Sequence, residues 1–360
     1  MLPSASLRER KLPALPDRET IFSLLSTEEY GVLPETDVSV EVSEPKILDA
    51  RICAGEADVS RVDFTFSSVY GTHTFPVYRV LHHDGKKRPF FVHPMFHTGA
   101  ENLCLPMEEI ADRGYNVLAF YHIDVTADNC DFSDGLAKVL LPNGQDTPHT
   151  AGKLRIWAYA ASRILDYAGT LPGLDLSQAA VMGHSRLGKT ALVAGLFDSR
   201  FRYVISNDSG CCGAALARGN TGLAGNADFS GGETVKDIVD RFPFWFAPAF
   251  YRYAQTNIPD AFDQHFLLAS IAPRFVYVAS ADMDAWADPA SEFLSCVAAS
   301  SAFTAMGTDG LIAPDAFPAA GDFFHEGRVG YHLRHGKHFL SRYDWNQYMD
   351  YIDRHKNDIL

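Results

Sequence analysis

Ser185 lies between two glycines, where a short apolar run meets a segment rich in alanine and leucine. The order of apolar run, Gly183-His-Ser185-Arg-Leu-Gly188 and helical run is typical of a nucleophile elbow. In such an elbow a sharp strand-to-helix turn lifts a serine hydroxyl out of a sheet, and the glycines remove side chains where strand and helix crowd together. The pattern predicts a serine that attacks acyl carbonyls. An ordinary strand-to-helix turn is the alternative for this segment alone.

Two cationic residues, Arg186 and Lys189, follow the serine at the beginning of the predicted helix. Positive side chains at a helix N-terminus oppose the helix dipole and cost some stability. Their presence favours a ligand that is anionic, or that becomes anionic during a reaction. Together with the amide N–H groups of the first helical turn, they indicate a place where an oxyanion formed beside Ser185 would be stabilised.

A serine nucleophile needs a base within hydrogen-bonding distance and a carboxylate that orients the base. In the fold that uses this elbow, the base is a histidine after the last strand. Three histidines occur there, namely His332, His335 and His338. His332 lies within the predicted strand and His335 at its end, where packing or surface roles are common. His338 follows the Gly336 turn, on a loop that can fold back over the sheet edge, so we predict that it is the base.

Two aspartates, Asp208 and Asp284, could supply the carboxylate. Asp208 follows a strand expected over residues 203–206, and Asp284 follows a strand expected over residues 274–280. Position alone favours Asp284, because the acid of this fold most often follows the penultimate strand. Each side chain could instead cap its own loop, so the residues alone leave the choice open.

The elements around these residues alternate between strands and helices after an antiparallel start. Period-two alternation over 62–66 and 75–81 predicts two antiparallel strands joined by a turn at Gly71. Further strands are expected over 88–92, 116–121, 179–182, 203–206, 274–280 and 329–333, and helices over 102–113, 153–168, 187–197 and 344–355. This order predicts an α/β-hydrolase fold, in which a mostly parallel central sheet has helices on both faces.

The polar, proline-punctuated residues 1–57 are expected to form an N-terminal arm packed on the hydrolase domain, with one helical stretch at 21–30. Residues 58–360 are expected to form the catalytic domain. Two long connections, 122–152 and 207–262, interrupt the alternation of strands and helices. Ligand-binding loops of such sheets lie at the carboxyl ends of the strands, so we expect these connections to border the site.

Composition limits the partners of the chain. Its 360 residues are 47% hydrophobic and 21% charged, as in globular proteins. The formal net charge of −14 argues against nucleic acid, because no basic stripe could offset it. No apolar run is long enough to span a membrane, and the first thirty residues hold no export signal. We therefore expect no membrane partner and a cytoplasmic location as written, or a secreted or periplasmic one if an export signal has been removed.

Six cysteines, two of them the neighbours Cys211 and Cys212, form no recognisable disulfide or metal-ligand pattern. We expect them to be small, buried, hydrophobic side chains. Neither a metal ion nor an organic cofactor is implied by the sequence.

Eight segments carry a resemblance to a known family, and they are Gly183–Lys189, Ser206–Ala215, Gly232–Val235, Phe242–Phe246, Asp263–His265, Ile271–Arg274, Trp286–Pro289 and Gly336–His338. In sequence and in order they resemble the bacterial glucuronoyl esterases, family 15 of the carbohydrate esterases. The likeness covers residues 75–355, and the Ser-Arg-x-Gly-Lys elbow distinguishes this family from other serine esterases. It implies cleavage of the ester between the glucuronic acid side groups of xylan and lignin alcohols.

The resemblance also implies catalytic roles for individual residues. Ser185 is similar to the family nucleophile, His338 to its base, and Arg186 to the arginine that helps to hold the oxyanion. Asp208 falls where the family usually has a glutamate as the acid, and Asp284 falls where many bacterial members have a second or replacement acid. We therefore expect Asp208→Asn to reduce activity more than Asp284→Asn.

Three further residues, Lys189, Glu233 and Trp286, match family positions that contact the uronate sugar. The resemblance implies that Lys189 and Glu233 bind sugar hydroxyls and that Trp286 offers a face for the ring. Residues 219–231 look like an insertion before Glu233, and Phe339 stands where an acidic residue often follows the catalytic histidine.

The predicted reaction is a two-step acyl transfer. His338 takes the proton of Ser185, the serine attacks the ester carbonyl, and the backbone N–H and guanidinium of Arg186 stabilise the oxyanion. His338 then protonates the leaving alcohol, and water releases a uronic acid. The expected substrate is a small-molecule or glucuronoxylan-derived ester. The alternatives are an acyl esterase such as a xylan deacetylase and, from another class, a catalytically silent binding protein of the same fold.

Overall fold

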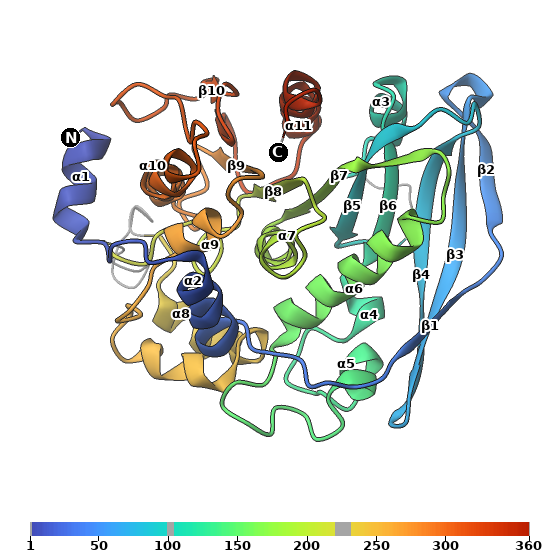
Figure 1. Ribbon diagram of the computed structural model, residues 1–360, viewed down its shortest axis with the longest axis horizontal. Coiled ribbons are helices and arrows are strands. Elements are labelled where there is room, and N and C mark those ends of the chain that lie inside the picture. Colours follow the sequence, from blue (N-terminus) through green and yellow to red (C-terminus); the bar gives the residue numbers. More distant parts are fainter. Residues whose placement is uncertain (1, 99–103, 220–231, 360) are drawn as a thin grey trace.

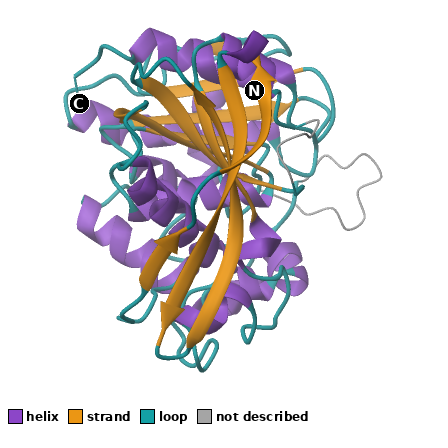
Figure 2. Cartoon of the chain, turned by 90° about the vertical axis from the view of Figure 1, so that its right-hand side faces the viewer, coloured by secondary structure: helices purple, strands orange, loops and turns teal. Residues whose placement is uncertain are grey.

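The computed structural model describes residues 2–98, 104–219 and 232–359, and they are organised around one large twisted sheet (Figures 1 and 2). In this described chain the strands follow the order β1-β3-β4-β6-β5-β7-β8-β9-β11-β10, with β2 paired to β3 outside that path. The strands are β1 (Ser39–Val42), β2 (Lys46–Ile52), β3 (Ala57–Ser68), β4 (Gly71–His82), β5 (Arg88–Met95), β6 (Asn116–Tyr121), β7 (Leu174–His184), β8 (Tyr203–Asn207), β9 (Phe275–Ala281), β10 (Phe323–Phe324) and β11 (Val329–Arg334).

The strands from β6 through β5, β7, β8 and β9 to β11 are parallel, and the remaining strands pair antiparallel at the two edges. Every residue of β8 and β9 is buried. Such continuous burial is expected of strands with helices on both faces. In β3 and β4, buried positions mostly alternate with more exposed ones, because one face of these strands packs on the core and the other does not.

Helices cover both faces of the sheet (Figure 1). One face carries α3 and α11, which contribute apolar residues to one hydrophobic cluster. The other face carries α6, α7 and α10, which contribute apolar residues to a second and larger cluster. The α-helices are α1 (Pro3–Arg10), α2 (Arg18–Leu24), α3 (Met107–Asp112), α4 (His122–Val125), α5 (Gly135–Leu140), α6 (Lys153–Ala168), α7 (Arg186–Phe197), α8 (Val235–Arg241), α9 (His265–Ala269), α10 (Pro289–Ala305) and α11 (Arg342–His355). Short π and 3₁₀ turns cover Leu25–Glu29, Cys53–Gly55, Pro243–Trp245 and Pro248–Ala254.

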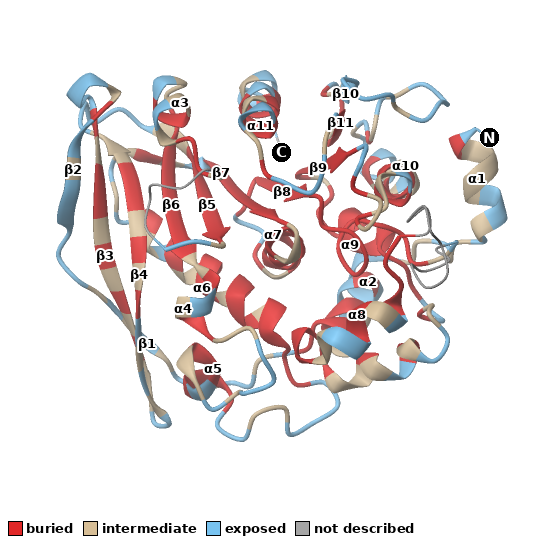
Figure 3. Cartoon of the chain, turned by 180° about the vertical axis from the view of Figure 1, so that it is seen from behind, coloured by how far each residue is buried: buried red, intermediate tan, exposed pale blue. Residues whose placement is uncertain are grey.

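The long helix α6 shows why its sequence is helical. Leu154, Trp157, Ala161 and Leu165 recur three or four residues apart and are all buried, which places them on one helix face. A Cβ atom on Gly152, just before the helix, would lie 2.1 Å from the carbonyl oxygen of Trp245. Glycine there lets the 3₁₀ turn at Pro243–Trp245 pack against the start of α6. The buried residues follow the sheet and the helix faces that touch it (Figure 3).

The predicted mostly parallel sheet with helices on both faces is confirmed. The strand at Asn116–Tyr121 and the helix at Lys153–Ala168 have the predicted bounds. Within the described residues, the helix expected over 102–113 covers only Met107–Asp112, and the helical stretch expected over 21–30 divides into α2 and the π turn.

Several elements were not predicted. The edge strand β2 is mostly exposed and lacks the apolar alternation that marks a half-buried strand. The edge strand β1 does alternate between valine and polar residues, but it is only four residues long. Both strands pair with β3, and thus residues before 58 contribute to the sheet. The division of the chain into an arm and a catalytic domain at residue 57 stays a prediction.

The two long connections follow neighbouring parts of the same sheet edge. Residues 122–152 follow the carboxyl end of β6, and the connection after β8 contains α8 and the 3₁₀ turns. Because β6, β7 and β8 run in the same direction, both connections border the carboxyl end of β7, where Ser185 begins the turn into α7. Among the described residues, no helix combines the length and the apolar character needed to cross a membrane.

Candidate active site

Ser185 joins β7 to α7 in a backbone conformation that side-chain-bearing residues rarely adopt, with φ 57° and ψ −128°. Such a conformation persists where the surroundings impose it. The Ser185 N–H donates to the carbonyl oxygen of Asn207, on β8, at 2.8 Å. A Cβ atom on Gly183 would lie 2.0 Å from the carbonyl oxygen of Leu187, so this position requires glycine. The result is a strand–turn–helix elbow that leaves Ser185 partly exposed.

The start of α7 supplies backbone N–H donors beside the serine. The N–H groups of Gly188 and Lys189 donate to the carbonyl oxygen of Ser185 at 2.9 and 3.2 Å. The N–H of Arg186 precedes these first helical bonds, at the end of the helix where the dipole is positive. This is an arrangement that can stabilise negative charge on a substrate oxygen.

His338 lies beside the elbow and is hydrogen-bonded to Asp284. Its ring centroid is 4.5 Å from that of His184, the residue before Ser185. The Nδ1 atom of His338 is 2.6 Å from Oδ2 of Asp284, and since an ionised carboxylate only accepts hydrogen bonds, Nδ1–H donates. Asp284 is buried, whereas the His338 side chain is 40% exposed. His338 thus combines an oriented ring with access to a substrate.

His184 is an electrically neutral neighbour of this histidine. Its Nδ1 atom is 2.6 Å from Oδ1 of Asn207. Burial, assisted by the charge on His338, lowers the pKa of His184 to about 3. At neutral pH the ring next to His338 therefore carries no positive charge that would hinder protonation of the base.

The loops that carry the acid and the base are tied to each other. They leave neighbouring parallel strands, β9 and β11. The backbone N–H of Asp282 donates to the carbonyl oxygen of Arg334, and that of Met283 donates to Gly336, each at 3.0 Å. The Asp282 carboxylate also contacts Nδ1 of His335 at 2.9 Å. These bonds fix the register in which Asp284 meets His338.

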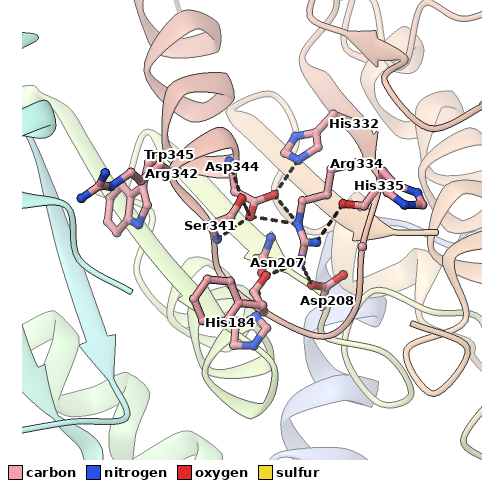
Figure 4. A network of polar contacts seen from close by, with 12 residues as sticks. His184, Asn207, Asp208, His332, Arg334, His335, Ser341, Arg342, Asp344 and Trp345 are labelled. Atoms are coloured by element: carbon pink, nitrogen blue, oxygen red, sulfur yellow. Dashed lines mark hydrogen bonds and ion pairs between the residues drawn. The ribbon is translucent and has the colours of Figure 1, made fainter. Parts of the chain in front are cut away.

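Asp208 also lies near His338. Its hydrogen-bond partner, however, is Arg334 (Figure 4). Candidate ligand atoms of Asp208, Asp284 and His338 all lie within 4.8 Å of one another. Oδ2 of Asp208 accepts from Nη2 of Arg334 at 3.1 Å, while Oδ1 has no hydrogen-bond partner among the described residues. Burial, together with the nearby carboxylates of Glu292 and Asp284, raises the pKa of Asp208 well above its ordinary value. The geometry and charge therefore favour Asp284 as the partner of His338.

The other two candidate histidines have different surroundings. His332 is fully buried, where it is hydrogen-bonded to Tyr277 at 3.0 Å and to Asp344 at 2.9 Å. His335 is exposed on the surface and contacts Asp282. Both placements agree with the packing and surface roles expected for them.

Arg186, the residue after the serine, has its guanidinium inside an aromatic enclosure. Its Nη1 group donates to Oδ2 of Asp128, and the second oxygen of Asp128 accepts from Nε1 of Trp245 at 2.7 Å. The guanidinium carbon is 4.8 Å from the ring centroid of Trp245 and 5.3 Å from that of Phe242. The guanidinium is thus held in place, while its buried Nε donor has no acceptor in the described part of the chain.

The three residues expected to contact a sugar lie near this enclosure. Lys189 is buried, with Nζ donating to the carbonyl oxygen of Ser209 and lying 6.0 Å from the Trp245 ring centroid. The backbone N–H of Glu233 donates to the carbonyl oxygen of Trp286 at 3.1 Å. Burial raises the pKa of the Glu233 carboxyl to about 7, although the charge of Lys189 opposes the shift. Of the insertion expected at 219–231, residues 220–231 lie outside the described part of the chain.

Trp286 itself is partly exposed. The guanidinium carbon of Arg241, on α8, lies 4.5 Å from the Trp286 ring centroid. One face of this ring therefore has a cation–π partner. The backbone bond to Glu233 and the contact with Arg241 fix the ring beside the connection after β8.

Two clusters among the described residues have metal-ligating atoms close together. One is Asp208 with Asp284 and His338, and the other is the more exposed set of Cys53, Glu108 and Asp112. In the first cluster, Nη2 of Arg334 lies 3.1 Å from Asp208. A permanent positive charge at that distance disfavours a second cation, so the cluster fits a histidine–carboxylate pair better than a metal site.

A family model described as fungal glucuronyl esterase matches residues 107–307, which is more than half of the chain. The chain belongs to the glucuronoyl esterase family. Members of this family are serine carboxylic-ester hydrolases, grouped as family 15 of the carbohydrate esterases. The matched residues include the elbow at Ser185 and the loop of Asp284, but they end before the loop of His338.

Curated relatives of the family share part of their length with this chain. A carbohydrate esterase from an unknown prokaryotic organism is 38% identical over 251 residues, covering 69% of this chain and 55% of that protein. A 4-O-methyl-glucuronoyl methylesterase from Hypocrea jecorina is 35% identical over 161 residues, covering 44% of this chain and 34% of that protein. The chain thus spans about half, or less, of the length of the curated relatives that it matches.

A solved structure matches the chain almost end to end. It is described as a promiscuous esterase of carbohydrate esterase family 15 from a marine bacterial metagenome. The TM-score is 0.82 and the sequence identity 29%, with 96% of this chain and 98% of that chain covered. The α/β-hydrolase fold of the family is therefore shared over 96% of this chain.

Sequence reasoning missed three residues that hold the site together. Asp128 lies in a loop without a recognisable motif, and Trp245 lies in the family-like segment Phe242–Phe246 without a role assigned to it. Arg334 ends β11 and gave no signal apart from its place near the candidate histidines. Each of the three makes a contact with a residue distant in sequence, namely Asp128 with Arg186 and Trp245, and Arg334 with Asp208, so only the assembled fold reveals these roles.

Proposed function

We propose that this member of the glucuronoyl esterase family hydrolyses esters of glucuronic acid or of its 4-O-methyl ether, as found in lignin–xylan cross-links. The observation that carries the proposal is the 2.6 Å hydrogen bond between His338 and Asp284 beside the serine elbow. With Ser185 it supports a nucleophile, a base and an orienting acid in the chain order expected of this fold.

Catalysis begins when His338 removes the proton from Ser185 and the serine oxygen attacks the ester carbonyl. Asp284 keeps the His338 ring in the tautomer with hydrogen on Nδ1, which leaves Nε2 free to accept the proton, and stabilises the imidazolium that forms. His338 then gives this proton to the leaving alcohol. A water molecule attacks the acyl-enzyme in the same way and releases the uronic acid.

The negative oxygen of the tetrahedral intermediate is stabilised by Arg186. Its backbone N–H lies at the start of α7, and its Nε is a buried donor without an acceptor in the described chain. An oxyanion would satisfy that donor only after the serine has attacked. Stabilisation that arises in the transition state and not in the bound substrate accelerates the reaction.

A uronate substrate is supported by Lys189, Glu233 and Trp286. A positive group near a buried carboxyl offers both a donor and an acceptor to sugar hydroxyls, and an indole offers an apolar face. The Hypocrea jecorina relative bears the name 4-O-methyl-glucuronoyl methylesterase, which supports the same acid component.

Hydrolysis of benzyl glucuronate by the purified protein tests the proposal, with Ser185→Ala as the matched control. We expect turnover in the wild type and a loss of at least about a thousandfold in the variant. A fluorophosphonate probe should label the wild type and leave Ser185→Ala unlabelled. A wild type that cleaves p-nitrophenyl acetate but no glucuronate ester would contradict the uronate assignment.

A broader carbohydrate acyl esterase is the second candidate. It is favoured by the description of the marine metagenome relative as promiscuous. Acetylated xylan and benzyl glucuronate should be compared at equal enzyme concentration. A higher kcat/KM for the acetyl ester would favour the second candidate, with Arg186 serving the oxyanion alone.

A further inference from the structure

The loop that carries His338 has no regular secondary structure. It joins the end of β11 at Arg334 to the start of α11 at Arg342, and His338 stands at its middle with a partly exposed side chain. An irregular loop has no ladder of backbone bonds to hold its shape. The position of His338 must therefore depend on contacts made from outside the loop.

Arg334 makes the contacts that flank His338. Its Nη2 group donates to the carbonyl oxygen of Lys337 at 2.8 Å and to that of Phe339 at close range. These are the residues immediately before and after His338. Its Nη1 group lies 3.5 Å from the carbonyl oxygen of His335. One buried guanidinium is thus hydrogen-bonded to the backbone on both sides of the histidine.

The guanidinium is itself fixed by two buried aspartates from different elements (Figure 4). Its Nε group donates to both oxygens of Asp344, on α11, at 3.1 Å, and its Nη2 group donates to Asp208, after β8, at 3.1 Å. Asp344 also accepts from His332 at 2.9 Å and from the Oγ and N–H of Ser341 at 2.7 Å. The Arg334 group therefore connects the sheet, the start of α11 and the loop of His338.

We propose that Arg334 is a positioning residue for His338 and that Asp208 serves as the hydrogen-bond partner of Arg334, leaving the acid role to Asp284. This inference rests on the proposed esterase function and assigns the work of two residues within it. Arginine suits the task because its planar group presents several donors in fixed directions. A lysine would supply a single ammonium point that cannot reach two carbonyls and two carboxylates together.

The environment of Asp208 agrees with this division of roles. Burial and neighbouring carboxylates raise the pKa of Asp208, and a carboxyl group that is harder to ionise is less suited to stabilising an imidazolium. Its Oδ2 atom can still accept the hydrogen bond from Arg334 in either protonation state. Asparagine at position 208 keeps that acceptor and resembles the protonated acid in shape.

The decisive variant is Arg334→Lys, with Arg342→Lys as its matched control. Arg342 begins α11, has a side chain that is 73% exposed, and pairs with Glu109 on the surface. Two readouts are needed. The first is kcat and KM for both p-nitrophenyl acetate and benzyl glucuronate. The second is the low-field proton NMR resonance of His338 Nδ1–H, which is assigned by its absence in His338→Gln. A displaced catalytic group lowers kcat without weakening substrate binding.

For Arg334→Lys we expect kcat to fall about a hundredfold with KM little changed and the low-field resonance to be lost or broadened. Arg342→Lys should match the wild type in both readouts. In Asp208→Asn the resonance should persist and kcat should fall by less than about tenfold. If Arg334→Lys does not fold, Asp208→Asn decides alone, because loss of the resonance there would make Asp208 the acid and overturn the proposal.

Failure of this inference differs from failure of the proposed function. Wild-type kcat and an intact resonance in folded Arg334→Lys would overturn the positioning role while the esterase proposal stood. A wild type without glucuronate turnover would reject the substrate proposal, whereas p-nitrophenyl acetate kinetics and the resonance would still report on Arg334. In a wild type with no turnover of either ester, the resonance alone decides.

Discussion

Two arginines border the residues of the site, Arg186 directly after Ser185 and Arg334 at the end of β11, before the loop of His338. Each is paired with an aspartate, but they differ in how many of their hydrogen-bond donors have acceptors within the protein. Arg334 has acceptors at Nε, Nη1 and Nη2 within the protein and is buried. Arg186 has a buried Nε without an acceptor in the described residues, and its side chain is 28% exposed. A satisfied guanidinium can only hold protein atoms in place, whereas an unsatisfied one can respond to charge that develops on a substrate.

The largest effect on activity is expected from Asp284→Asn, which changes the hydrogen-bond partner of the base His338. Asparagine cannot hold the His338 ring in the productive tautomer, so kcat should fall by about 10⁴-fold. Asp208→Asn, the matched variant, should cost less than about tenfold. This order reverses the one expected from the resemblance alone. Steady-state kinetics of both variants test it, and a greater loss in Asp208→Asn would restore the earlier order.

Arg186→Lys tests the role of Arg186 in stabilising the oxyanion. The variant keeps a positive charge but loses the Nε donor and the planar group that packs on Trp245. We expect kcat to fall about a hundredfold, the scale found for removal of an oxyanion donor, while the low-field resonance of His338 persists. A lower kcat with an unchanged resonance would show that Arg186 acts on the oxyanion without affecting the His338–Asp284 hydrogen bond. Loss of the resonance in Arg186→Lys would show that Arg186 and that hydrogen bond are coupled.

Asp128→Asn tests whether Arg186 needs its partner. The asparagine keeps one acceptor for Nε1 of Trp245 but removes the charge that faces the Arg186 guanidinium. We expect kcat to fall about tenfold, equivalent to roughly 1.4 kcal/mol of barrier. After long incubation, the fluorophosphonate probe should label Ser185 of the variant to the same final extent as in the wild type. An unchanged kcat would mean that the aromatic rings alone hold the guanidinium.

The smallest effect on activity is expected from Glu292→Gln, because Glu292 is not one of the residues assigned to the reaction. Glu292 accepts from the Gly210 N–H and from Ser280, and burial raises its pKa to about 8. The folded protein therefore keeps a proton that the unfolded chain loses above the ordinary pKa of 4.5. Wild-type stability from this group falls as pH rises from that ordinary value to the raised one.

Glutamine does not titrate, so the unfolding free energy of Glu292→Gln relative to wild type should rise by about 1.4 kcal/mol per pH unit across that window and level off outside it. Urea denaturation at acidic, neutral and alkaline pH measures this difference. A difference that is the same at all three values would show that folding does not shift the pKa of Glu292.

Local sequence patterns were sufficient for the nucleophile elbow and for the long helix α6. The glycines around Ser185 marked the elbow, and the regular apolar spacing of residues 153–168 gave α6 its bounds. By contrast, α10 was not predicted. Many of its residues are alanine and serine, and its buried positions include polar residues, so its sequence shows no clear helical spacing of large apolar residues. Burial of such a helix is decided by the sheet it packs on and not by its own pattern.

The contacts that assign roles were outside the reach of sequence patterns. Arg334 meets Asp208 across 126 positions, and Arg186 meets Asp128 across 58. Nothing in the local sequence of either aspartate distinguishes it from one that caps a loop. The choice between Asp208 and Asp284 likewise depended on which carboxylate the folded loops bring to His338, and chain order alone could not measure that distance.

The parallel pairing of β9 with β11 also has a consequence for how the protein acquires activity. The segments that bear Ser185, Asp284 and His338 come together only when distant parallel strands have docked, and closing such long connections is slow compared with forming helices. During refolding from denaturant, helical structure should therefore return before turnover does. Catalytic competence then becomes a kinetic marker for completion of the sheet.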